Sequence, residues 1–177
     1  MKSREAMMSQ AMRITSAAIV ALAAASCAPS ETARLEANKD LVHRFTATLN
    51  AADWAGLDSL LTEDFRRHSQ ATPGVQVTSR ADFKKLQESF LATMPDQHVT
   101  IDMLVAEDDK VAGLATYTGT MTGPMGEFQP TGKRAESKFI SIFRIEGDRI
   151  AELWVEWDNL AMLEQLGLFP PPAEPSD

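Results

Sequence analysis

Apolar residues along the first half of the chain recur at the spacing of α-helices. Helices are predicted over residues 34–50, in a short segment after Asp53, and from Ser79 to the residue before Pro95. Asp53 and Ser79 are residue types that accept hydrogen bonds from the first free N–H groups of a helix. Pro95 lacks the N–H that a continuing helix needs, so the third helix ends there. The first half of the chain is therefore predicted to be helical.

The second half of the chain alternates apolar and polar residues with the period of β-strands. Strands are predicted over residues 99–105, 111–121, 137–145 and 150–157. Each strand has one apolar face, which we expect to lie toward the helices. For the first strand this face comprises Val99, Ile101, Met103 and Val105. A last short helix is expected to end at Gly167.

Three helices followed by an antiparallel meander predict the α+β class. We expect a cone-like α+β barrel with three N-terminal helices packed on a curved antiparallel sheet of about four main strands, followed by a short C-terminal helix. A sheet that curls around helices can enclose a cavity. Its outer face mixes threonines with Ile140, Ile142 and Trp154. This half-apolar face is compatible with a homodimer surface.

The N-terminus has the pattern of a secretory signal. Basic residues precede the apolar run of residues 14–25, which ends at Ser26 and Cys27. Small residues directly before a single cysteine are typical of a bacterial lipoprotein, in which Cys27 is lipidated and becomes the new N-terminus. The alternative is an ordinary signal cut near Ser26. Either route takes the mature chain out of the cytoplasm, and lipidation would hold it in the cell envelope, facing the periplasm.

The predicted organisation is therefore a single domain with short flanking segments. Its parts are a lipoprotein-type signal over 1–26, a tether over 27–33, the domain over 34–168 and a disordered tail over 169–177. The length of 177 residues and the hydrophobic content of 44% suit one globular domain. The only cysteine excludes an internal disulfide.

The charge of the chain argues against some partners. Removing residues 1–26 takes three basic residues and one acidic residue from the formal charge of −8, which leaves −10. The remaining charges are dispersed and form no basic patch. We therefore expect no binding to nucleic acid and no membrane contact except through the lipid anchor.

Several short motifs follow one another over roughly residues 36–168. They are residues 92–96 (ATMPD), 119–123 (GTMTG), 130–134 (PTGKR), 143–145 (FRI) and 152–154 (ELW), then Asp158 and 165–167 (QLG). No motif is specific alone, but together and in this order they resemble the SnoaL-like polyketide cyclases, or ester cyclases, of the nuclear transport factor 2-like superfamily.

The resemblance implies a pocket between the helices and the concave face of the sheet. In the cyclases an Asp on the last strand acts as acid and base in an intramolecular aldol closure, assisted by a His on the preceding strand. When the chain is aligned through Arg144, Gly147, Asp158 and residues 165–167, the Asp position falls on Val155 and the His position on Ser141. Met121 likewise replaces the His of the usual GTHTG strand end. None of these three side chains transfers protons readily near neutral pH, so this route to cyclase activity is not expected here.

The predicted pocket would hold a small apolar or aromatic molecule that carries oxygen. The Tyr117 hydroxyl could orient a carbonyl group of such a molecule. The alternative is that the same side chains simply fill the core. The nine residues predicted to line the pocket are Trp54, Tyr117, Met121, Phe139, Ser141, Phe143, Leu153, Val155 and Trp157.

Two other residues remain as candidate catalytic groups. Asp158 is either a relocated acid and base or the N-cap of the helix that follows it. His68 is either a base or hydrogen-bond donor in the pocket, or part of an exposed polar turn with Arg66 and Arg67. The histidines and the cysteine have no metal-ligand spacing, and no cofactor is predicted.

Three hypotheses about function remain open. The first is an envelope-anchored domain that binds a small ligand, with the family's acid and base replaced. The second is an enzyme of lyase, isomerase or hydrolase type that uses His68 or Asp158. The third is a non-catalytic structural homodimer.

Overall fold

The computed structural model describes residues 29–169, and the predicted signal, Cys27 and most of the predicted tail lie outside this range. The chain divides into two units, residues 1–34 and residues 35–177, and the second contains the sheet and the core. No described helix has the length and apolar character needed to cross a membrane.

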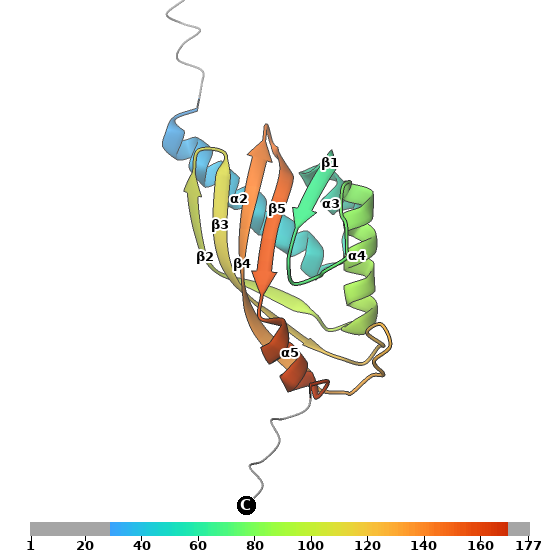
Figure 1. Cartoon of the computed structure of the whole chain (residues 1–177). Coiled ribbons are helices and arrows are strands. Elements are labelled where there is room, and N and C mark those ends of the chain that lie inside the picture. Colours follow the sequence, from blue (N-terminus) through green and yellow to red (C-terminus); the bar gives the residue numbers. More distant parts are fainter. Residues whose placement is uncertain (1–28, 170–177) are drawn as a thin grey trace, which may run out of the picture. The chain divides into compact units, whose positions relative to one another are not determined.

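Helices and strands follow one another in the predicted order (Figure 1). The first predicted helix begins at residue 31, three residues earlier than expected. Residues 63–68, for which the sequence allowed a short strand or a turn, belong to a strand that begins at residue 61. The elements are α2 (Glu31–Asn50), α3 (Trp54–Leu60), β1 (Leu61–His68), α4 (Arg80–Thr93), β2 (His98–Glu107), β3 (Lys110–Thr120), β4 (Arg134–Glu146), β5 (Arg149–Trp157) and α5 (Asn159–Leu166).

The five strands form one sheet in the order β1-β5-β4-β3-β2. The four strands from β2 to β5 pair antiparallel, and β1 pairs parallel with β5 at the edge. In Figure 1, α2 crosses one face of this sheet and α4 stands beside β1. The α+β fold class is confirmed, and the fifth strand makes the sheet mixed.

Side-chain caps fix where the described helices begin. Asp53 accepts a hydrogen bond from the backbone N–H of Gly56 at 2.9 Å, at the start of α3. Ser79 accepts one from the N–H of Asp82 at 3.1 Å, and Ser79 Oγ donates back to Asp82 Oδ2 at 2.8 Å. Such caps satisfy N–H groups that have no partner within the helix.

The core lies between the sheet and the helices and is rich in aromatic rings. Phe83 on α4 contacts Phe65 on β1, with ring centroids 4.9 Å apart, and Phe45 on α2 at 5.9 Å. Phe45 also meets Phe143 of β4 edge to face at 5.6 Å. These contacts join both long helices to two strands of the sheet.

The prediction that Met103 and Val105 face the helices is wrong. They are 56% and 58% exposed. The register of β2 against β3 shifts between Ile101 and Met103. One extra residue at such a bulge reverses which side chains face inward, so Leu104 packs on the core instead.

Candidate functional site

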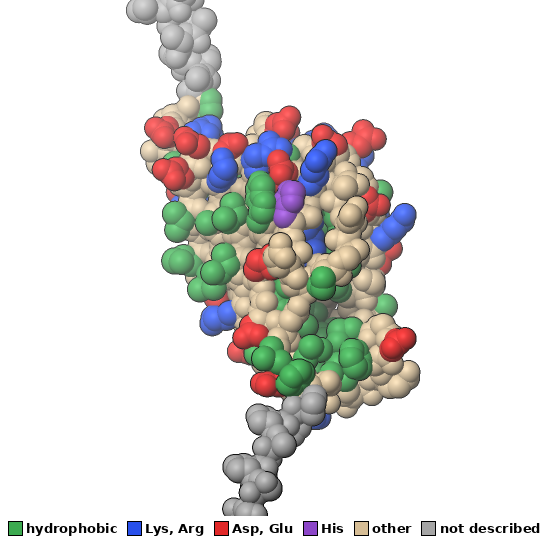
Figure 2. All heavy atoms as spheres, viewed as in Figure 1, with side chains coloured by type: hydrophobic (Ala, Val, Ile, Leu, Met, Phe, Trp, Pro, Cys, Tyr) green, Lys and Arg blue, Asp and Glu red, His purple; other side chains and the backbone are tan. Residues whose placement is uncertain are grey.

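A cavity of about 490 Å³ lies between the sheet and helices α2 and α4. Ile101, Ala115, Phe139 and Leu153 line it from the strands, and Phe90 lines it from α4. Figure 2 shows a hollow on the viewed face near hydrophobic side chains. This volume is within the range of small-molecule sites, which are mostly apolar with a few polar groups.

The cavity wall contains few groups able to transfer protons. Arg67 and Tyr117 are the only ionisable side chains among the described residues that line it, and no Asp, Glu, His, Lys or Cys lies in that wall. Its other polar groups are hydroxyls and amides from residues such as Thr46, Asn50 and Gln97.

Tyr117 extends from β3 into the cavity wall. Its hydroxyl lies 3.1 Å from Gln97 Oε1, to which it donates, and 3.4 Å from Met94 Sδ. Burial, with a smaller contribution from Asp96, raises the pKa of Tyr117 to about 12. The phenol therefore stays protonated near neutral pH and can act as a hydrogen-bond donor but not as a base.

Arg67 is a buried cation, which contradicts the exposed polar turn that was one of the two alternatives for residues 66–68. Only 7% of the residue is exposed, because β1 continues through this position and turns its side chain inward. Its guanidinium lies over the Trp157 ring at 5.6 Å and donates from Nη1 to Thr72 Oγ1 at 2.9 Å. Burial lowers the pKa of Arg67, and the charge of Glu156 partly opposes this.

Ser141 and Val155 lie side by side in the wall of this cavity. They are directly paired across β4 and β5, and both are buried. Seven of the nine residues predicted to form a pocket line this cavity, and Trp54 and Met121 do not. The seven are Tyr117, Phe139, Ser141, Phe143, Leu153, Val155 and Trp157.

Trp54 and Met121 belong to the packing around the cavity. Trp54 packs against the main core cluster. Met121 is fully buried in a second cluster with Met94, Ala135 and Leu166. The sequence pattern indicated that both side chains face the interior, but it could not distinguish residues that line the cavity from residues packed in the core behind it.

Asp158 caps helix α5. Its carboxylate accepts a hydrogen bond from the backbone N–H of Ala161 at 3.0 Å, and it does not line the cavity. No group of three potential ligands among residues 29–169 is arranged to hold a metal ion.

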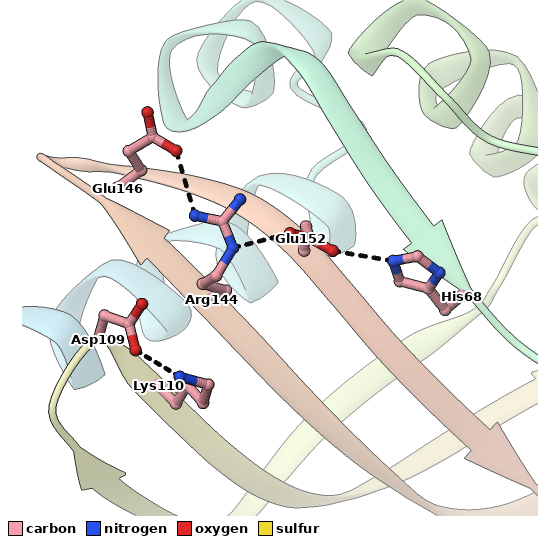
Figure 3. A network of polar contacts seen from close by, with 6 residues as sticks. All are labelled: His68, Asp109, Lys110, Arg144, Glu146 and Glu152. Atoms are coloured by element: carbon pink, nitrogen blue, oxygen red, sulfur yellow. Dashed lines mark hydrogen bonds and ion pairs between the residues drawn. The ribbon is translucent and has the colours of Figure 1, made fainter.

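His68 does not line the cavity and belongs to a network of charged groups (Figure 3). Its Nε2 lies 3.0 Å from Glu152 Oε2, and its ring stacks on Trp154 at 4.9 Å. Arg144 donates to Glu152 at 2.8 Å and to Glu146 at 3.1 Å. His68 thus contributes to the outer face.

Glu152 makes the stability of the domain depend on pH. Hydrogen bonds from His68 and then Arg144 lower its pKa below the ordinary value of 4.5. Its stabilising contribution is therefore present above about pH 4.5 and lost as the pH falls through the lower folded-state pKa. We expect Glu152→Gln to reduce the free energy of unfolding by about 0.5–1 kcal/mol at pH 7 and much less at pH 3, measured by urea denaturation.

Glu127→Gln is the matched control, because Glu127 is exposed and makes no ion pair among the described residues. It should change stability little at either pH. An equal loss at pH 3 and pH 7 for Glu152→Gln would show that the carboxylate charge is not what stabilises the network.

The family profile of the SnoaL-like polyketide cyclases matches residues 39–166. The chain belongs to this family. No curated protein matches it. The matched region includes every strand and both long helices from residue 39 onward, so the fold and the family agree over nearly the whole described domain.

Solved structures with this fold include proteins to which different chemistries have been assigned. AclR from Streptomyces galilaeus, provisionally described as a hydroxylase, is 28% identical with a TM-score of 0.68, covering 79% of this chain and 91% of its own. IdmH from Streptomyces antibioticus, provisionally described as a polyketide cyclase, is 26% identical with a TM-score of 0.66, covering 73% and 98%. A protein from Jannaschia is 18% identical with a TM-score of 0.71, and the match covers 81% of this chain and 100% of the Jannaschia chain. Fold membership alone therefore does not assign a reaction to this chain.

Proposed function

We propose that this SnoaL-like protein binds a small apolar, oxygen-bearing molecule in its cavity without the family's acid–base chemistry. One observation carries the proposal. A cavity of about 490 Å³ has a largely apolar wall in which no described carboxylate or imidazole lies. Such a site favours binding of an apolar molecule and offers no general base near neutral pH.

The residues at the family's catalytic positions support the absence of this chemistry. We infer from the motif alignment that Val155 replaces the Asp and Ser141 the assisting His. The two are paired neighbours in the cavity wall, as an acid and base acting on one ligand would need to be. Val155 carries no proton to transfer, and the raised pKa of Tyr117 makes that phenol a poor substitute.

The enzyme hypothesis finds less support. Asp158 is occupied as a helix cap and His68 pairs with Glu152 on the outer face, so neither reaches the cavity. A proton-transfer role for either would need a ligand bound elsewhere.

The outer face of the sheet favours a homodimer as an additional part of the proposal. Val105, Ala112, Ile142 and Trp154 follow one another in register across four strands, and all are exposed. Figure 2 shows hydrophobic side chains gathered on this face below a band of charged ones. A contiguous apolar patch of this kind is typical of interaction surfaces.

The proposed location is the cell envelope, with Cys27 lipidated as the only membrane attachment. This rests on the signal-like residues 1–26 and the small residues before Cys27. The acidic composition suits a domain that stays off anionic lipid surfaces.

The experiment that tests the proposal is native mass spectrometry of the chain with Cys27→Ser, purified gently from its own host. We expect a complex with one small molecule per subunit, and fragmentation of that molecule should show an apolar, oxygen-bearing compound. A spectrum of ligand-free protein at every solution condition would overturn the proposal. The same spectrum reports the number of subunits and so tests the dimer.

A further inference from the structure

The Arg67 guanidinium has more hydrogen-bond donors than partners. It carries five N–H groups, and its single hydrogen bond among the described residues goes to Thr72 Oγ1. None of the described carboxylates forms an ion pair with it, although the residue is 93% buried and lines the cavity. A buried charge normally has a charged or hydrogen-bonding partner, because leaving water is costly.

Glu156, the carboxylate whose charge opposes the lowered pKa of Arg67, is engaged elsewhere. Glu156 accepts hydrogen bonds from the backbone N–H groups of Gln70 and Ala71 at 2.6 and 3.0 Å. It contributes charge near Arg67 but no direct contact. Its position orders the loop after β1 and leaves the guanidinium without a bidentate partner.

The surroundings of Arg67 add another donor instead of an acceptor. Trp157, whose ring lies beneath the guanidinium, has a buried indole N–H with no hydrogen-bond partner among the described residues. This part of the wall thus has two donor groups and too few acceptors. An acceptor supplied by a ligand would correct that imbalance.

We propose that Arg67 pairs with a carboxylate of the bound molecule, so that the cavity's ligands are small carboxylic acids with an apolar body. This inference rests on the proposed binding function and specifies its ligand class. The planar guanidinium matches the two oxygens of a carboxylate, whereas a single carbonyl oxygen would leave most of its donors unused. The apolar wall from Phe139, Leu153 and Val155 accommodates the rest of the molecule.

The negative charge of the chain does not oppose this ligand class. The formal charge of −8 does not place negative charge in the wall, because every described Asp and Glu lies outside it. The only charge in the described wall is the positive charge of Arg67. A carboxylate inside would therefore meet a positive local field, which is strengthened by the exclusion of water.

The test compares decanoate with decanamide, which has nearly the same shape and no charge. Isothermal titration calorimetry is done on the full chain carrying Cys27→Ser and on the same chain with Arg67→Met. We expect the unchanged cavity to bind decanoate about 10- to 100-fold more tightly than decanamide. Arg67→Met replaces the guanidinium with a shorter, unbranched and uncharged side chain, and it should remove this preference while decanamide still binds.

The outcomes separate this inference from the proposed function. If both probes bind equally to the unchanged cavity, or if Arg67→Met keeps the preference, the carboxylate inference is wrong and the apolar site stands. If neither probe binds, the carboxylate inference is wrong, and the native mass spectrum decides the proposed function separately. Thr72→Val is the control, because it removes the hydrogen bond of Arg67 within the chain and should leave the preference for decanoate intact.

A second measurement tests the inference on the unchanged protein, so it does not require Arg67→Met to fold. Decanoate labelled with ¹³C at the carboxyl carbon reports its own pKa by NMR when bound to the unchanged protein. Pairing with a guanidinium lowers the pKa of a carboxyl group, whereas burial in an apolar cavity alone raises it. We expect a bound pKa below that of free decanoate, and a raised value would overturn the inference.

Discussion

Ala115→Phe is expected to weaken binding of a small apolar molecule at least about 100-fold, which corresponds to about 2.8 kcal/mol. Ala115 lies in the cavity wall on β3, paired with Ile101 on one side and Phe139 on the other. A benzyl group there would occupy volume that the ligand needs. Because the ring enters open space, its cost to stability should be below the ~1–3 kcal/mol of an overpacked core. Calorimetry with decanamide measures the loss.

Ala112→Phe provides the matched control for this substitution. Ala112 is on the same strand, three residues earlier, but it faces outward and does not line the cavity. Ligand binding should be unchanged in this variant, whether or not the new ring on the proposed dimer surface alters the number of subunits. If Ala115→Phe binds as well as the unchanged chain, the ligand does not occupy the cavity.

Phe65→Ala is expected to lower the free energy of unfolding by about 3–5 kcal/mol, the range for truncating a buried aromatic ring. Phe65 is fully buried on β1 and packs against Phe83 of α4 at 4.9 Å. It does not line the cavity, so the loss reflects the packing of α4 on the edge strand. Urea denaturation followed by circular dichroism measures it, against a total stability of about 5–15 kcal/mol for a typical domain.

Phe128→Ala is the control for the aromatic truncation. Phe128 is 47% exposed, and removing its ring should change stability by less than about 0.5 kcal/mol. A cost for Phe65→Ala similar to that of Phe128→Ala would mean that the contact between β1 and α4 contributes little to the fold.

The parts of the fold that follow from local chemistry could be predicted from sequence. Asp53, Ser79 and Asp158 are capping residues in the sequence and cap helices in the structure. The apolar faces of β3 and β5 also lie inward as their alternation predicts. These features depend on neighbours a few residues apart, which a single sequence displays.

Features that depend on pairing between distant segments could not be predicted in this way. The bulge in β2 is a property of its register with β3, and the sequence of β2 alone continues to alternate past Ile101. The burial of Arg67 depends on the parallel pairing of β1 with β5, where Arg67 lies opposite Leu153. Two adjacent arginines in a polar segment are typical of an exposed turn, so the sequence pattern favoured exposure of Arg67 and not its burial.

The cavity wall also has one part that could be predicted from the sequence and one part that could not. Alternation identified seven of its wall residues, including Ser141 and Val155. It could not distinguish Met121, which is buried in solid core, because an inward direction is the same in both environments. Only the contacts of α4 and α5 with the sheet decide which inward side chains meet open volume.

The central claim is that the cavity holds a small molecule, and one native mass spectrometry comparison tests it most directly. The chain with Cys27→Ser is purified from its host beside the same chain with Ala115→Phe and with Ala112→Phe. We predict a bound molecule in the first and third samples and none in the second. The same molecule in all three samples, or in none of them, would contradict the claim.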